Sequence, residues 1–513
     1  MWYELLVSSS VILTLQTLGS FIFLTVVSLP WLLKLRRKYV RMTLSVKYKV
    51  PKDCKIVAFF HPYCGSGGGG ERVLWTAIKA MCSRWEPQVL VIYTNDLRCF
   101  QDKQLVFESV KKTFSLSLNI GDKPIAIHFV RIITQPLLSP RLYPVFTLLG
   151  QALGSMVVAL EALLRCPPDV FLDTVGFGFT LPVARWLAGA KTAAYVHYPT
   201  ISSDMVDRIT RDGKSEISLY NNAAWIRKSK IASAIKLVYY CIFTRLYKWA
   251  GSPMNLNVVM TNSSWTQNHI SSLWGGKPTI LYPPCPTDDL SIKAYAQNGR
   301  KPWIMSVGQF RPEKDHELQL RAFHVFLKRH CLLDKPEEHN FRLLLIGGCR
   351  DANDLNLVDK LRKTMVLLQL EKVVEFHINL PYKSLRRYLH ECTINLHTML
   401  DEHFGISVVE GMASGLITVA HNSGGPRADI IGPAVCRLPS SQSSGSPKPK
   451  YTGVGYLASS AEEYADTFDY ILLQMTPAER LSIQNAARER AQSKFSEECF
   501  LEGWLKQMTF LGL

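Results

Sequence analysis

The 513-residue sequence lacks the cysteine patterns of a disulfide-stabilised or zinc-stabilised protein. Its 12 cysteines are scattered, without a C-x-x-C pair or a Cys/His cluster at zinc-ligand spacing. We therefore expect reduced thiols and a protein that faces the cytosol. No internal repeat and no D-x-D sequence occur either. The second absence disfavours a site in which paired aspartates hold a metal ion against a diphosphate, so no metal ligand is predicted.

The chain has little negative charge relative to its positive charge. It carries 59 Lys and Arg against 42 Asp and Glu, a formal net charge of +17. Such an excess predicts attraction to polyanions. Nucleic acid is disfavoured as the partner because the basic residues are dispersed and no helix-turn-helix, zinc-finger or RNP-like segment accompanies them. An anionic membrane surface and a diphosphate substrate account for the same charge.

Charged residues are absent from Leu5 to Leu33, a stretch longer than the roughly 20 residues that span a bilayer core. A basic cluster follows the stretch, whereas Glu4 precedes it, so the positive-inside rule places the rest of the chain in the cytosol. The cluster consists of Lys34, Arg36, Arg37, Lys38 and Arg41. A basic region before the stretch and a small-residue cleavage site, which mark a signal peptide, are missing. Residues 1–41 are therefore predicted to form an uncleaved single-span anchor with a basic flank.

The remaining chain alternates short apolar runs with helical segments, a pattern typical of doubly wound parallel sheets. Its length suggests two domains. The predicted strands are Lys55–Phe60, Val89–Tyr93, Val170–Asp173, Thr192–Val196 and Val258–Met260, then Trp303–Val307, Arg342–Ile346, Val373–Phe376, Thr393–Leu396 and Ile417–Ala420. We predict an α/β protein with two Rossmann-like domains, residues 52–285 and 301–495, that face a cleft. Residues 496–513 are expected to form a helix that crosses back to the first domain.

Two other segments are rich in apolar residues. Leu142–Leu164 is interrupted by Pro144, Gly150, Gly154 and Glu161, so helices packed within the first domain are favoured over a second span. Ala232–Ala250 mixes aromatic with basic residues and resembles a helix lying in a membrane interface. Core packing with exposed lysines is the alternative for that segment.

Two carboxylates, Glu402 and Glu410, are placed eight positions apart where a predicted strand passes into a predicted helix, Ile406–Ala413. Ligands of open α/β sheets bind beyond the carboxyl ends of the strands, and a helix N-terminus there favours anionic oxygens. Phosphates are thus a natural ligand at this junction. A bare Glu-x7-Glu pair is also what an ordinary amphipathic helix shows.

A glycine-rich loop follows the first predicted strand. Gly65, Gly67 and Gly70 satisfy G-x-G-x-x-G between a strand and a helix, and Asp96 follows the next strand. This arrangement is compatible with a dinucleotide site, so an NAD-dependent oxidoreductase is one alternative. In either interpretation, the loop lets backbone amides approach a phosphate or a sugar.

Three further side chains follow predicted strands. His197 ends the strand Thr192–Val196, although a lone histidine is more often structural. Arg311 and Lys314 come after the first strand of the second domain, where a guanidinium and an ammonium can clamp a departing diphosphate. Solvated loop cations are the alternative.

Taken together, the acidic pair, Asn422-Ser-Gly-Gly-Pro426 and Gly69-Gly-Glu-Arg72 resemble the retaining glycosyltransferases with two Rossmann-like domains, the GT-B type. This resemblance implies a role for each predicted site residue. Glu402 would lie at the donor sugar and Glu410 at the ribose, His197 would contact the sugar, and Gly69 and Gly70 would border the donor phosphates. Asn379–Lys383 would lie near the base. The family commonly has Arg where this chain has Gln309, so the role of Arg311, two positions on, departs from the usual pattern.

From Val57 to Phe510 the chain most resembles one branch of these enzymes, which extends dolichol-linked trimannosyl-chitobiose with α-1,2-linked mannose from GDP-mannose. The most specific segments are Phe59–Tyr63, Tyr195–Ser202, Ser306–Lys314 and Glu402–Gly405. The resemblance implies addition of the fourth and fifth mannoses at the cytosolic face of the endoplasmic reticulum membrane. It also suggests other mannosyltransferases of that pathway as partners, and it implies no cofactor.

An α-linked donor that gives an α-linked product requires retention of configuration. With no obvious nucleophile, we expect a front-side displacement in which the leaving phosphate oxygen takes the acceptor's proton. Arg311, Lys314 and the amides near Phe404 and Gly405 would stabilise the charge, while Glu402 holds the mannose. A non-catalytic membrane scaffold derived from the transferase is the other alternative, against which the intact Glu402, Glu410 and Lys314 argue.

Overall fold

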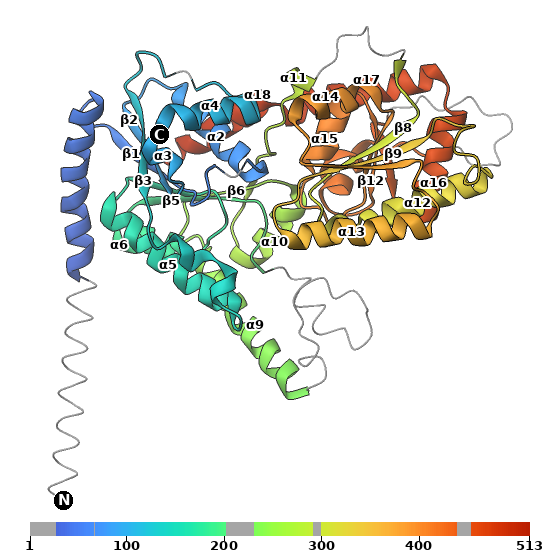
Figure 1. The fold of residues 1–513 in the computed structure, drawn as a ribbon. Helices are drawn as coiled ribbons and strands as arrows, with labels where there is room; N and C mark the ends of the chain where they lie inside the picture. The colour runs from blue at the N-terminus through green and yellow to red at the C-terminus, as the bar shows by residue number, and fades with distance from the viewer. Residues whose placement is uncertain (1–26, 66, 119, 202–229, 291–298, 439–452) are drawn as a thin grey trace, which may run out of the picture.

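The computed structural model describes residues 27–65, 67–118, 120–201, 230–290, 299–438 and 453–513, and most of the predicted anchor lies outside these ranges. Two parallel sheets stand side by side, each flanked by helices (Figure 1). The predicted pair of Rossmann-like domains is thereby confirmed.

The first sheet has seven strands in the order β3-β2-β1-β4-β5-β6-β7. Its strands are β1 Lys55–Phe60, β2 Gln88–Thr94, β3 Ile125–Arg131, β4 Val170–Asp173, β5 Lys191–Val196, β6 Val258–Thr261 and β7 Thr279–Ile280. The helices of this half are α2 Gly69–Cys82, α3 Arg98–Gln101, α4 Lys103–Phe114, α5 Thr147–Arg165, α6 Thr180–Leu187, α9 Lys230–Ala250, α10 Ser264–Trp274 and α11 Thr287–Leu290.

The second sheet has six strands in the order β10-β9-β8-β11-β12-β13. Its strands are β8 Trp303–Val307, β9 Arg342–Gly347, β10 Val374–Ile378, β11 Ile394–His397, β12 Ile417–His421 and β13 Gly455–Ala458. Its helices are α12 His316–Arg329, α13 Ala352–Leu367, α14 Tyr382–Glu391, α15 Ile406–Ala413, α16 Ala461–Asp469 and α17 Pro477–Phe495, and α18 Glu497–Thr509 follows them.

Apolar residues fill both faces of the first sheet, as expected for parallel strands covered by helices on each side. In β1, Ile56 and Phe60 belong to the core on one face, and Val57 and Phe59 belong to the core on the other. This alternation explains why the strand is an uninterrupted apolar run. Polar residues are therefore found beyond the carboxyl ends of the strands, outside the two apolar faces.

Residues 27–48 form a helix that packs on the first domain through Leu33 and Leu44. Its basic residues contact the same domain. Arg37 and Arg41 pair with Asp169 at 3.5 and 2.6 Å. The basic flank of the predicted anchor therefore fastens this helix to the globular part of the chain.

The segment expected to hold several helices forms one helix, α5, in spite of its glycines. One side of α5 packs in the core through Val158 and Ala159, whereas Leu153 and Val157 on the other side are exposed. Within the described residues, α5 is the helix that is long and apolar enough to cross a membrane, and 39% of its most apolar window is buried.

The aromatic residues of α9 were expected at the lipid interface, but the structure buries two of them. Phe243 and Tyr247 pack inward against Phe179 of the first domain. The outward stripe is mainly aliphatic and consists of Val238, Ile242, Leu246 and Trp249. The residues within each stripe are three or four positions apart and therefore share one face of the helix, so α9 is both a core helix and an apolar surface.

The last helix, α18, returns from the second half of the chain to pack on α2 of the first. Trp504 is fully buried, with its ring stacked on Phe59 of β1 and Phe500. Glu497 pairs with Lys79 of α2. The two halves of the molecule are thus connected by two crossings of the chain.

We predict that Trp504→Ala lowers the free energy of unfolding by about 3 to 5 kcal/mol, the usual cost of removing a buried aromatic side chain. Phe510→Ala is the control because Phe510, which directly follows the end of α18, is largely exposed. Its expected change is within about 0.5 kcal/mol. Denaturant titration followed by circular dichroism measures both, and equal effects would contradict the described packing.

Candidate active site

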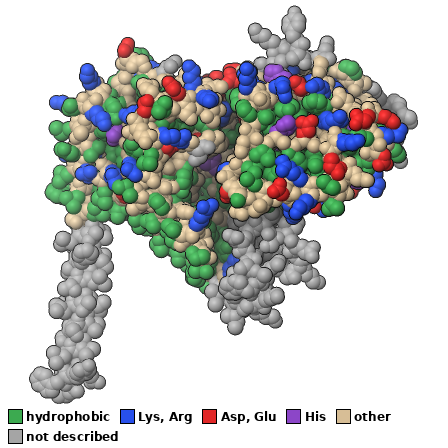
Figure 2. Space-filling view, viewed as in Figure 1, with side chains coloured by type: hydrophobic (Ala, Val, Ile, Leu, Met, Phe, Trp, Pro, Cys, Tyr) green, Lys and Arg blue, Asp and Glu red, His purple; other side chains and the backbone are tan. Residues whose placement is uncertain are grey.

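A cleft of about 1260 Å³ lies between the two halves and is lined by residues of both. Figure 2 shows it as the hollow between the two lobes, with histidine inside. Of the predicted site residues, Gly69, Gly70, His197, Lys314, Glu402, Phe404, Gly405 and Glu410 line this cleft. The elements that carry them end at the cleft because the carboxyl ends of the strands in both sheets face it.

Glu402 lies in the loop between β11 and α15 and forms an ion pair with Lys314. His397, the last residue of β11, places its Nε2 3.2 Å from the same carboxylate oxygen. Burial alone would raise the pKa of Glu402, but the His397 hydrogen bond and the Lys314 charge outweigh it and hold that pKa well below its usual range. Glu402 is therefore an ionised acceptor of hydrogen bonds and is unsuited to acting as a general acid.

The loop after β12 fixes the backbone of Glu402. Gly425 donates its N–H to the Glu402 carbonyl at 2.7 Å, and the Asp401 N–H donates to Ser423 Oγ at 2.7 Å. Gly424 has a φ of +55°, and a Cβ added there would be 2.3 Å from the Glu402 carbonyl oxygen. The Gly-Gly sequence is thus required for this close approach.

Helix α15 begins at Ile406, directly after Gly405, and no side chain caps its N-terminal N–H groups. The glycine-rich loop of the first domain meets this helix end, since a Cβ added at Gly69 would be 3.0 Å from Ile406 Cδ1. Glu410 lies further along α15. Burial raises its pKa, and the Arg72 charge opposes this shift.

Arg311 departs from its expected place. It pairs with Glu313 at 3.5 Å and is not among the described residues that line the cleft, whereas Gln309 and Lys314 are. The chain turns into a short 3-10 helix at Pro312–Lys314, which separates the directions of Arg311 and Lys314.

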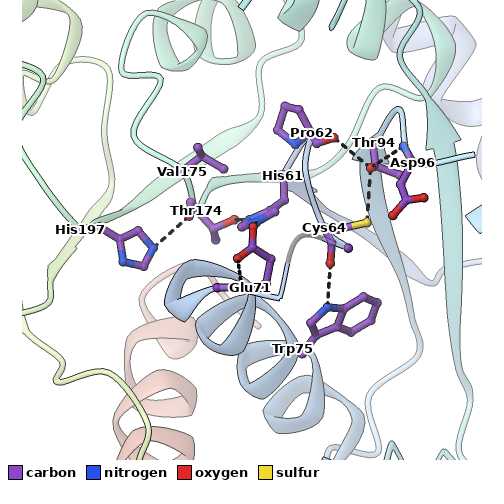
Figure 3. A network of polar contacts seen from close by, with 12 residues as sticks. His61, Pro62, Cys64, Glu71, Trp75, Thr94, Asp96, Thr174, Val175 and His197 are labelled. Carbon is purple, nitrogen blue, oxygen red and sulfur yellow. Dashed lines mark hydrogen bonds and ion pairs between the residues drawn. The ribbon is translucent and has the colours of Figure 1, made fainter. Parts of the chain in front are cut away.

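The wall of the cleft formed by the first domain contains a polar network (Figure 3). His61 shares a hydrogen bond of 2.8 Å with Thr174 Oγ1, and its Nε2 lies 3.8 Å from Glu71. His197 Nε2 lies 3.2 Å from the Thr174 carbonyl, which can only accept, so the ring carries a proton there. Burial, aided by the His61 charge, lowers the pKa of His197 to about 4. His197 is therefore neutral near pH 7.

Sequence reasoning did not single out His61 and Thr174. Both line the cleft, and each directly follows the end of a strand, His61 after β1 and Thr174 after β4. Position after a strand was the signal that identified His197, and the same signal applies to these two residues. Asn379 and Tyr382, near the expected base site, also line the cleft.

Asp96, the acidic residue of the dinucleotide alternative, is paired with an arginine outside the cleft. Arg98 holds its carboxylate through two contacts of 2.9 and 2.6 Å. Asp96 also forms, with Cys64 and Cys99, the one group with metal-ligand chemistry found among the described residues. This group lies outside the lining of the cleft. A ribose-binding role for Asp96 is therefore disfavoured.

Two family models together match most of the chain. Residues 54–274 match the model described as "ALG11 mannosyltransferase N-terminus", and residues 288–490 match "Glycosyl transferases group 1". A relative from Homo sapiens, GDP-Man:Man(3)GlcNAc(2)-PP-Dol alpha-1,2-mannosyltransferase, is 41% identical over 483 residues, which cover 92% of this chain and 90% of the relative. The chain belongs to the ALG11 mannosyltransferase family. It is a glycosyltransferase, as the sequence resemblance implied.

Relatives with the same name extend beyond animals. The one from Dictyostelium discoideum is 38% identical over 469 residues, which cover 90% of this chain and 86% of the relative. Among solved structures, Anabaena HepE with UDP and glucose matches with a TM-score of 0.55 at 15% identity, over 89% of this chain and 99% of that one. Sucrose-phosphate synthase from Thermosynechococcus elongatus matches with a TM-score of 0.57 at 15% identity, over 90% and 100%. These structures support the GT-B fold.

We predict that Gly424→Ala moves the Glu402 loop and lowers glycosyltransferase activity at least about tenfold. Gly121→Ala is the matched control, because Gly121 has the same φ of +55° but no atom within 4 Å of an added Cβ. Both variants should lose about 1 to 2 kcal/mol of stability to left-handed backbone strain. Turnover assays and thermal unfolding separate the two effects, and equal activity in the two variants would contradict the role of this contact.

Proposed function

We propose that this chain transfers mannose from GDP-mannose, in α-1,2 linkage, to a dolichol-diphosphate-linked trimannosyl-chitobiose. The observation that carries the proposal is the cleft itself: an ionised Glu402 held by Lys314, beside an uncapped helix N-terminus, in a chain about 40% identical to relatives named for this reaction. The first domain would bind the lipid-linked acceptor, and residues 301–495 would bind the nucleotide sugar. Addition of the fourth and the fifth mannose is the expected extent of the reaction.

The arrangement supports a displacement with retention. The donor sugar would lie between Glu402 and His197, with the diphosphate at the start of α15 and the ribose at Glu410. Lys314 and the N-terminal amides of α15 near Phe404 and Gly405 would stabilise the negative charge of the leaving diphosphate. Its phosphate oxygen would take the proton from the acceptor hydroxyl. Glu402, ionised and already holding Lys314, would orient the mannose.

Removal of either partner of the Glu402–Lys314 pair should abolish most of the activity. Glu402→Ala and Lys314→Ala are each expected to reduce the turnover number about 100-fold to 1000-fold, the usual cost of losing one preorganised electrostatic group. Glu338→Ala is the control, because Glu338 forms only an exposed pair with Lys335. Radiolabelled GDP-mannose and a synthetic lipid-diphosphate trimannosyl-chitobiose measure the transfer, with and without a chelator. Activity should persist in the chelator, since no D-x-D sequence is present.

Full activity in Glu402→Ala would contradict the proposal and favour the scaffold alternative. Consumption of another nucleotide sugar by the unsubstituted protein, without use of GDP-mannose, would keep the reaction class and overturn the donor. Loss of activity in chelator would overturn the metal-independent mechanism alone.

We also propose that the enzyme works at the cytosolic face of the endoplasmic reticulum membrane, where other mannosyltransferases of the pathway would be its partners. The apolar stripe of α9 and the exposed side of α5 support contact with lipid. Both helices lie on the lower side of the first domain in Figure 1, the side toward which the helix of residues 27–48 also extends. An anchor before residue 27 and these two helices would then meet the same surface.

Two natural cysteines test this orientation. Cys241 is exposed on α9, and Cys331 is exposed after α12 in the second domain. An environment-sensitive fluorophore is attached to Cys241 in a Cys331→Ser variant, and to Cys331 in a Cys241→Ser variant. Upon reconstitution into anionic vesicles, the Cys241 label should shift to shorter wavelength, whereas the Cys331 label should not. The reverse pattern, or no shift at Cys241, would place α9 away from lipid.

A further inference from the structure

The cations of the cleft differ in whether a carboxylate already neutralises them. Among the described residues that line the cleft, the cations of Lys and Arg are Arg72, Lys314 and Arg350. Lys314 pairs with Glu402, and Arg350 lies 3.9 Å from Asp354. No carboxylate in the described part of the chain lies within ion-pair distance of Arg72. Among the described cations of this lining, Arg72 is therefore the one that no carboxylate neutralises.

Arg72 is also unusual in its burial. The residue is only 7% exposed, and its Nη1 has no hydrogen-bond partner among the described residues. The guanidinium lies 5.4 Å from the centre of the Phe114 ring, a contact that orients it without satisfying its N–H groups. Because a buried charge without a partner is costly, such a group is expected to face a ligand.

The position of Arg72 indicates which part of a ligand it would meet. Arg72 is the fourth residue of α2, directly after the glycine-rich loop whose Gly69 touches Ile406 at the start of α15. It lies near enough to Glu410, on the far domain, for its charge to act on that carboxylate. Glu402 and Glu410 lie at the two ends of the expected nucleotide sugar. Between the sugar and the ribose lies the diphosphate.

We propose that Arg72 binds the diphosphate of the nucleotide and supplies, from the first domain, the second cation that Arg311 was expected to supply from the second. The inference rests on the proposed function, since it assigns a ligand group within the same cleft. A guanidinium and the N–H groups of Gly69 and Gly70 on one side, with Lys314 and the α15 N-terminus on the other, would enclose the phosphates between the two domains.

A purely structural role for Arg72 makes a different prediction. If the guanidinium served only to pack on Phe114, its loss would weaken all ligands through a shift of α2, with or without phosphates. If it served only to bind phosphate, its loss would weaken GDP and leave guanosine unchanged. The loss of GDP affinity compared with the loss of guanosine affinity therefore distinguishes the two roles.

The experiment compares Arg72→Gln, Arg72→Lys and the unsubstituted full-length protein in detergent by isothermal titration calorimetry with GDP and with guanosine. Arg321→Gln is the matched control, because Arg321 lies on α12 in an exposed pair with Glu317. Loss of a charged hydrogen-bond donor should weaken GDP binding by Arg72→Gln about 10-fold to 100-fold. Guanosine binding should change less than about threefold, and Arg72→Lys should recover part of the GDP affinity. Thermal unfolding verifies that each variant is folded.

Three outcomes would overturn the inference: unchanged GDP affinity in Arg72→Gln, an equal loss for GDP and guanosine, or an increase only in the Michaelis constant of the lipid-diphosphate acceptor. The last result would place the anion on the acceptor. Absence of GDP binding by the unsubstituted protein would overturn the proposed function as well. The two failures are thus distinguishable.

Discussion

The partly buried ion pair between Lys314 and Glu402 is the interaction on which the cleft depends. The two residues are 88 positions apart, but their loops follow β8 and β11, which are neighbours in the second sheet. A carboxylate buried there would be costly without a partner, and the ammonium of Lys314 and the ring of His397 supply that partner. The Asn422–Pro426 loop then holds the backbone of Glu402 through Gly425. The sheet topology, the ion pair and the tight loop therefore act together to fix the position of Glu402.

This pairing has a consequence for binding. Glu402 neutralises part of the charge of Lys314, so an anionic ligand in the cleft needs positive potential from further groups beside Lys314. The N-terminus of α15 is one such group, and under our inference Arg72 is another. Because these two sources belong to different domains, ligand binding and the approach of the domains would be energetically linked. The crossing of α18 onto α2, the helix that carries Arg72, strengthens the mechanical connection between the halves.

The fold was predictable because its signals are local. Apolar runs such as Lys55–Phe60 and Trp303–Val307 fix the strands, and glycine-rich turns fix where the helices begin. Most of the predicted site residues line one cleft because they follow strands whose carboxyl ends face it. Their roles remain predictions. The sequence could not reveal the direction of Arg311, which follows from the 3-10 turn at Pro312–Lys314, or the burial of Arg72, whose guanidinium packs on Phe114. The inward packing of Phe243 and Tyr247 likewise required the tertiary structure.

The arrangement of apolar surface fits the physical difference between the two proposed substrates. A dolichol-linked acceptor is confined to the membrane, whereas a nucleotide sugar diffuses in water. The exposed apolar residues of α5 and α9, and the helix of residues 27–48, all belong to the first domain. If that domain rests on lipid, an acceptor sugar reaches the cleft along the wall formed by His61, Glu71 and His197 without leaving its lipid. The donor then enters from the water-facing second domain. The different solubilities of the two substrates thus account for an acceptor-binding first domain and a donor-binding second domain.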